Sequence, residues 1–120
     1  MANVNDLYNK GFGQMGSVFT DTTGAITPPS NRVFIAITFL ADANFAAGAN
    51  GLTADTSNDS VEFVGTAAGA HDASAATSVS GTGGDTIDAS NTFPKGMTIY
   101  GRWTKITLNA ASPLIAYIGD

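Results

Sequence analysis

Residues 31–42 read NRVFIAITFLAD and contain the longest apolar run of the chain. The run is rich in β-branched and aromatic residues and is flanked by turn-forming residues, a pattern that indicates a β-strand. Alternation would place Val33, Ile35, Ile37 and Phe39 on one face of this strand. The other face would hold Phe34, Ala36, Thr38 and Leu40. Because both faces are mostly apolar, we expect one to be covered by the domain's own core and the other by something else.

Further strand signals lie on both sides of this stretch. Residues 17–20 (SVFT) predict a short strand, and residues 61–65 (VEFVG) predict another through the alternation of Val and Phe around Glu. The intervening residues 44–60 and the Ala-, Ser- and Thr-rich residues 66–92 are typical of turns and surface loops.

The last third of the chain again has strand character. Residues 96–108 (GMTIYGRWTKITL) alternate, with the apolar preference changing faces near Lys105, which suits a bulge or bend. Residues 109–113 (NAASP) fit a hairpin loop, and residues 114–119 (LIAYIG) form the expected final strand. No segment has the period of an amphipathic helix, so the predicted fold is all-β, an antiparallel β-sandwich of jelly-roll type.

We expect one β-domain over residues 17–120, preceded by an extended N-terminal arm over residues 1–16. The arm is polar and glycine-rich and has no helical period. It carries four larger apolar side chains that are candidates for contacts with a partner: Leu7, Tyr8, Phe12 and Met15.

Composition excludes several classes of function. The 120-residue chain has no cysteine, which rules out disulfides, thiolate-bound zinc and thiol catalysis. Its net charge of −5 and its scattered basic residues argue against nucleic-acid binding. Charged residues make up only 12% of the chain, which suits a surface covered by neighbours in an assembly. The N-terminus lacks the pattern of a signal peptide, so we expect synthesis in a cytoplasm and no membrane partner.

The stretch GFGQMG at residues 11–16 matches the spacing of a dinucleotide-binding loop. That motif requires a strand before it and a helix after it, whose N-terminus holds the pyrophosphate. Here a polar arm precedes the glycines and a strand signal follows them. We therefore interpret the glycines as part of a bendable arm and expect no nucleotide or other cofactor.

Other candidate sites also have a simpler structural interpretation. Four acidic residues could suggest calcium, but in turn sequences they more often bond their own backbone: Asp55, Asp59, Asp85 and Asp88. His71, beside Asp72, fits a solvated loop, and no nucleophile motif accompanies it, so we expect no enzyme. Trp103, Tyr100 and Tyr117 could form a platform for carbohydrate, although a single strand tryptophan more often lies in a core or an interface.

Three stretches of the chain together resemble small virion structural proteins of tailed bacteriophages, especially those that infect marine bacteria. They are residues 16–42 (GSVFTDTTGAITPPSNRVFIAITFLAD), residues 90–108 (SNTFPKGMTIYGRWTKITL) and residues 114–120 (LIAYIGD). The resemblance covers most of residues 16–120 and implies a capsid decoration, or cement, protein on the outside of the mature head. An alternative is a tail-fibre or receptor-binding module that recognises a cell-surface glycan.

A decoration role implies two partners, the major capsid protein and further copies of the chain, with a trimer favoured. In that role the four apolar residues of the arm would contact the capsid or a neighbouring copy. Self-association would use apolar residues of the strands: Phe34, Leu40, Ile115 and Tyr117.

Overall fold

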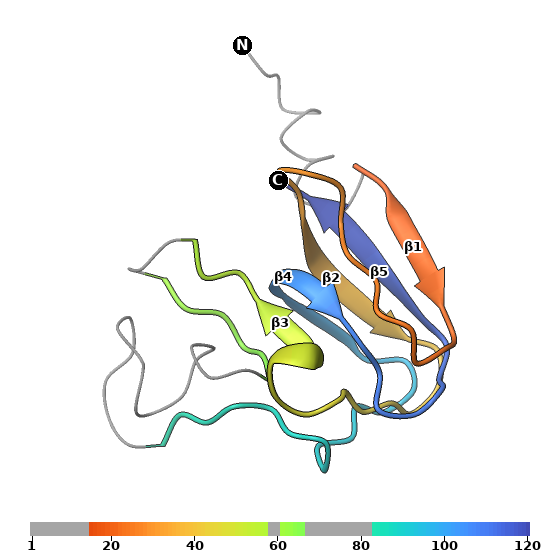
Figure 1. Ribbon diagram of the computed structural model, residues 1–120. Coiled ribbons are helices and arrows are strands. Elements are labelled where there is room, and N and C mark those ends of the chain that lie inside the picture. Colours follow the sequence, from red (N-terminus) through yellow and green to blue (C-terminus); the bar gives the residue numbers. More distant parts are fainter. Residues whose placement is uncertain (1–14, 58–60, 67–82) are drawn as a thin grey trace.

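The computed structural model describes residues 15–57, 61–66 and 83–120, which form one antiparallel sheet (Figure 1). Its five strands lie in the order β1-β5-β2-β4-β3. Their bounds are β1 (Ser17–Thr20), β2 (Val33–Phe39), β3 (Leu52–Ala54), β4 (Thr98–Ile106) and β5 (Leu114–Gly119). A single 3-10 turn, η1 (Gly48–Asn50), is the one helical element of the described residues. The all-β prediction is confirmed.

A bulge in β2 changes the faces predicted for that strand. Phe34 pairs with Ile118 of β5, whereas Ala36 pairs with Tyr117, so Ile35 is an extra residue relative to β5. The extra residue reverses the alternation. Phe34 consequently points to the same side as Ile37 and lies in the core with 1% of its surface exposed. The prediction that Phe34 takes part in self-association is therefore wrong, because its own domain already buries it.

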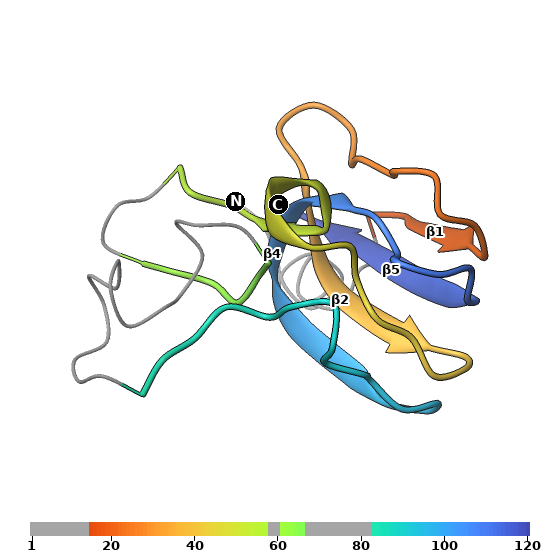
Figure 2. The same ribbon diagram turned by 60° about the horizontal axis from the view of Figure 1, so that its bottom comes forward.

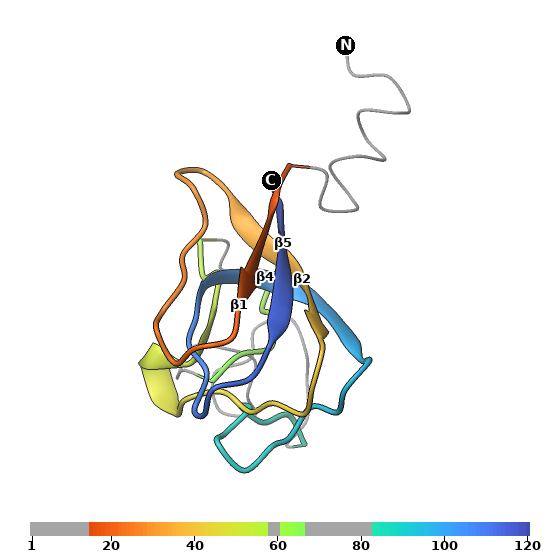
Figure 3. The same ribbon diagram turned by 90° about the vertical axis from the view of Figure 1, so that its right-hand side faces the viewer.

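The core lies on one face of the sheet, which we call the inner face. β2, β4 and β5 contribute most of its buried side chains: Phe34, Ile37, Phe39, Trp103, Ile106, Leu114, Ala116 and Ile118. Connecting segments form the layer that covers this face, with residues 21–32 and η1 on one side of the sheet in Figure 3. The strands thus pack against loops, and the described residues form a single sheet.

Three phenylalanines close one end of the core. Phe39 at the end of β2 stacks on Phe93, with ring centroids 5.2 Å apart. Phe45 meets both rings edge-on, at 5.9 Å from Phe39 and 5.5 Å from Phe93. Backbone hydrogen bonds between Ala43, which follows β2, and Phe93, which precedes β4, hold these two connecting segments together. Both segments run along the end of the sheet in Figure 2. Loop residues therefore supply part of the hydrophobic core.

Two predictions for the edges and loops are corrected. Residues 61–65 form no strand; instead, Thr66 lies beside Leu52 of β3, an element that the sequence did not predict. Residues 109–113 are not a hairpin loop, because β2 separates β4 from β5 in the sheet. The predicted bulge near Lys105 is confirmed: Thr53 pairs with Lys105 and Ala54 with Trp103, which leaves one β4 residue unpaired between them.

Most of the predicted N-terminal arm lies outside the described residues, which begin at Met15. Met15 packs partly buried against the core, and its Sδ accepts a hydrogen bond from Arg32 Nη1 at 3.6 Å. Within residues 15–57, 61–66 and 83–120, no helix is long and apolar enough to cross a membrane.

Candidate functional site

Trp103 belongs to the core and cannot serve a ligand platform. Its side chain is 0% exposed, and its Nε1 donates a hydrogen bond to the carbonyl oxygen of Val64 at 2.8 Å. Tyr100, by contrast, is 74% exposed on the opposite face of the sheet. The three aromatic residues therefore do not form one platform, and the interpretation of Trp103 as a core residue is confirmed.

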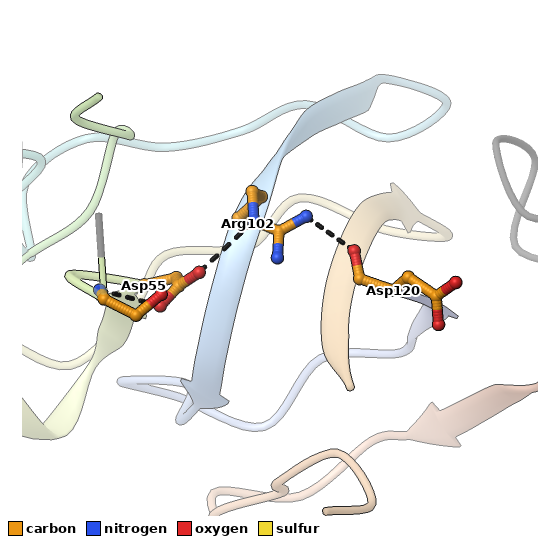
Figure 4. Close-up of polar contacts among 4 residues, drawn as sticks. Asp55, Arg102 and Asp120 are labelled. Carbon is orange, nitrogen blue, oxygen red and sulfur yellow. Dashed lines mark hydrogen bonds and ion pairs between the residues drawn. The ribbon is translucent and has the colours of Figure 1, made fainter. Parts of the chain in front are cut away.

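The acidic residues act in turns and in an ion pair. Asp55 Oδ1 accepts the backbone N–H of Ser57 at 3.1 Å, and its Oδ2 lies 3.2 Å from Arg102 Nε (Figure 4). Burial alone would raise the pKa of Asp55, but the hydrogen bonds from Ser57 and Arg102 and the charge of Arg102 together lower it. Arg102 Nη1 also donates to the main-chain oxygen of Asp120 at 2.6 Å. This cluster ties β4 to the residues after β3 and β5.

Asp85 and Asp88 also accept hydrogen bonds from nearby backbone groups. Asp88 Oδ1 accepts the N–H of Ser90 at 2.8 Å, and Asp85 Oδ1 accepts the N–H of Thr86 at 2.8 Å. Hydrogen bonds from Ser90 hold the pKa of Asp88 below its ordinary value. No group of three potential metal ligands occurs among the residues that the structure describes. Asp59, His71 and Asp72 lie outside them.

The face of the sheet opposite the core carries two rows of paired residues, and we call it the outer face. One row runs across four strands through Phe19, Ile115, Thr38 and Thr98. The second row runs beside it through Ser17, Tyr117, Ala36 and Tyr100. Leu40 lies two residues after Thr38, and its N–H donates a hydrogen bond to Pro113 O at 3.0 Å, so the pairing with the β5 side continues to this residue. Leu40 therefore lies on the outer face at the end of the rows. Paired residues of an antiparallel sheet point to the same side, so these side chains share one surface.

The outer face combines exposed apolar side chains with hydroxyl groups, and Arg102, which follows Tyr100 in the alternation of β4, places one charged group at its margin. Phe19 is 56% exposed and Leu40 is 41% exposed, while Ile115 and Tyr117 are half-buried between them. Neither row contains a charged residue. The central pair of threonines satisfies its own hydroxyls, with Thr38 Oγ1 and Thr98 Oγ1 at 2.9 Å. Such a continuous patch on a sheet is typical of a surface that binds another macromolecule.

The structure brings together three of the four residues predicted for self-association. Leu40, Ile115 and Tyr117 share the outer face, whereas Phe34 lies in the core. Sequence reasoning missed Phe19. The alternation of SVFT would have placed Phe19 and Val18 on different faces of the strand. Of the arm residues predicted as contacts, Met15 packs against the chain's own core. The other three lie outside the described residues: Leu7, Tyr8 and Phe12.

The last glycine of GFGQMG leads directly into a strand. Gly16 has a φ of 125° and its carbonyl oxygen accepts the N–H of Ile118 at 2.8 Å, so it belongs to the ladder between β1 and β5. A dinucleotide-binding loop needs the N-terminus of a helix at this point. The structure therefore supports a structural role for Gly16, whereas Gly11 and Gly13 lie outside the described residues.

Comparisons of the chain with protein-family models, with curated proteins and with solved structures found no match.

Proposed function

We propose that the chain is a bacteriophage capsid decoration protein, which binds the outside of the mature head and stabilises it by bridging major capsid proteins. The observation that carries this proposal is the outer face, whose two rows carry no charged residue and expose aromatic and aliphatic side chains. The resemblance of three stretches of the sequence to small phage virion proteins adds to it. Together they favour a binding role on a virion surface.

The small number of exposed residues on the outer face suits binding by many copies at once. The largest apolar patch of an ordinary protein covers roughly 300–600 Å², whereas a stable interface buries about 800 Å² on each partner. The exposed side chains of the outer face belong to a handful of residues, led by Phe19 and Tyr100. Each contact is then modest, and a closed shell multiplies it, because binding at one site raises the effective concentration at its neighbours.

Leu40, Ile115 and Tyr117 pack between copies on the outer face, with Phe19 and Tyr100 beside them, and a trimer at local three-fold positions of the shell is the favoured assembly. The arm, with Leu7, Tyr8 and Phe12, reaches the major capsid protein or a neighbouring copy. No catalytic step or cofactor is part of this role.

The test is co-sedimentation of the purified protein with expanded, tailless heads of its phage that lack it. We expect saturable binding with a fixed number of copies per shell. Binding that never saturates, or no binding at all, would contradict the proposal.

A second candidate function rests on Tyr100 and Tyr117, which flank Ala36 on neighbouring strands of the outer face. Tyrosines on an open sheet can stack on sugar rings, as a receptor-binding module of a tail fibre requires. Attachment of the labelled protein to host cells, lost with Tyr100→Ala and competed by a cell-surface glycan, would favour this candidate over a head protein.

A further inference from the structure

The two edges of the sheet differ. At β3, Thr66 occupies the edge: its N–H donates to Leu52 O at 2.8 Å, and its Oγ1 accepts the N–H of Leu52 at 2.8 Å. At β1, the other edge, no described segment lies beyond the strand, which is the outermost one in Figure 1. Among the described residues, one edge of the sheet is therefore covered and the other is open.

The alternation of the ladder shows which backbone groups of β1 face outward. The N–H of Ile118 donates to Gly16 O at 2.8 Å, and Val18 pairs with Ala116, so the even-numbered residues of β1 bond to β5. The N–H and C=O groups of Ser17 and Phe19 then point away from the sheet. They form a template for one more strand.

β1 lacks the features that usually protect an edge. Natural sheets guard open edges with lysine, proline, bulges or a covering loop. β1 reads SVFT, has no charge, no proline and no bulge in its pairing with β5, and exposes Phe19. Within the part of the chain that the structure describes, the short length of β1 is its one protective feature, and it suits pairing with a strand of the same length.

We propose that β1 pairs antiparallel with β1 of a second copy, about a two-fold axis at Val18. This register joins the outward groups of Ser17 in each copy to those of Phe19 in the other, by four backbone hydrogen bonds. The side chains are complementary in size, because the exposed Phe19 of each copy lies opposite the small Ser17 of the other. A two-fold interface requires such self-complementarity, and a foreign strand would not have it by default.

Charge complementarity supports the same register. Asp21, which is exposed directly after β1, comes opposite Met15 of the second copy. Arg32 Nη1 lies 3.6 Å from Met15 Sδ and is held beside it by an ion pair with Asp120. Continued one residue past β1, the same register brings Asp21 of each copy toward the Arg32–Asp120 ion pair of the other, where Arg32 can contact both carboxylates, and the two-fold axis repeats this contact at both ends of the paired strands.

This pairing joins the outer faces of the two copies into one surface, since Phe19 lies both on the outer face and in the paired strand. It does not rest on capsid binding, and it is compatible with a trimer, because a closed shell has local two-fold as well as three-fold positions. If β1 does not pair in this way, the proposed function is unaffected. If the protein does not bind heads, the pairing of β1 is unaffected.

Cross-linking tests the register directly, because the chain has no cysteine of its own. Opposed residues at a non-hydrogen-bonded position lie about 4.5 Å apart at Cα, within reach of a disulfide. We expect Val18→Cys to form a disulfide-linked dimer under mild oxidation, and Thr22→Cys, in an exposed position just beyond β1, to stay largely uncross-linked. Equal cross-linking of the two variants, or none with Val18→Cys, would overturn the proposal.

A proline at an outward position tests the backbone pairing. Ser17→Pro removes an N–H that faces away from β5, so the bonds within the sheet remain, whereas Ser17→Ala keeps that N–H. Losing two of four intermolecular bonds should weaken association in sedimentation velocity about tenfold or more for Ser17→Pro, with Ser17→Ala close to the wild type. Identical association of the two variants, both folded by circular dichroism, would show that β1 is not the paired strand.

Discussion

At the scale of single residues, Trp103 and Gly101 form one packing unit of β4. A Cβ atom built at Gly101 would lie 2.6 Å from Cζ2 of Trp103, so the indole ring rests directly on the glycine backbone. Glycine at this position lets the largest buried side chain of the core fold back over its own strand.

Removing the indole should be among the most damaging single changes in the described part of the chain. Trp103→Ala leaves a cavity in the core and should cost about 3–5 kcal/mol of the free energy of unfolding. Trp103→Phe should cost less, because a ring still fills much of the space, although Val64 O loses its donor. Urea unfolding measures both, and an unchanged midpoint for Trp103→Ala would refute the burial of the side chain.

Adding one methyl group beneath the indole should also destabilise the protein. Gly101→Ala forces the ring or the strand to move and should cost about 1–3 kcal/mol. Gly24→Ala is the matched control, since its Cβ would meet only Thr22 Oγ1 at 3.5 Å. Equal unfolding midpoints of the two variants would mean that the Trp103 ring is not packed on Gly101.

At the scale of elements, the ion pair of Asp55 and Arg102 joins the end of β3 to β4 (Figure 4). The pKa of Asp55 in the folded protein lies below its ordinary value of 3.8, so its contribution to stability is fully present above that pH. As the pH falls below 3.8 and through the folded pKa, the carboxylate takes up a proton and this contribution is lost.

Comparison with Asp55→Asn isolates this effect. At neutral pH the variant should be less stable by about 1–2 kcal/mol, a modest value because Arg102 is partly exposed. The difference from the wild type should shrink as the pH falls from 5 toward 2, measured by denaturant unfolding at each pH. A difference independent of pH would show that the carboxylate charge does not stabilise β3.

The strong strands were predictable because their signals are local. Residues 33–41, 96–108 and 114–119 alternate or are densely apolar, and residues 17–20 do so over a shorter length. β3 was not predictable, since the three residues LTA become a strand only by pairing with β4. The bulge at Ile35 likewise exists only relative to β5, and it decided the outcome for Phe34. β3 and the bulge both depend on pairing between segments far apart in the chain, and a local sequence pattern does not predict such pairing.

At the scale of the whole molecule, the proposed function has two separate binding elements, the outer face and the N-terminal arm. Deleting residues 1–14 leaves Met15, which packs on the core, in place, so the fold should survive with an unchanged unfolding midpoint. Binding to heads should weaken in a co-sedimentation titration, because the contacts of Leu7, Tyr8 and Phe12 are lost. If the shortened protein binds as tightly as the full chain, the arm has no part in attachment.

We propose that the outer face attaches the protein to its assembly, and one pair of variants tests this role. Tyr100→Lys puts a charge into the uncharged rows at a position 74% exposed, where the fold does not depend on the side chain. Ala110→Lys adds the same charge at an exposed residue of the segment between β4 and β5, outside both rows. In co-sedimentation with heads that lack the protein, we predict a loss of affinity of about tenfold for Tyr100→Lys and none for Ala110→Lys. Equal binding of both variants would contradict the assignment of the outer face.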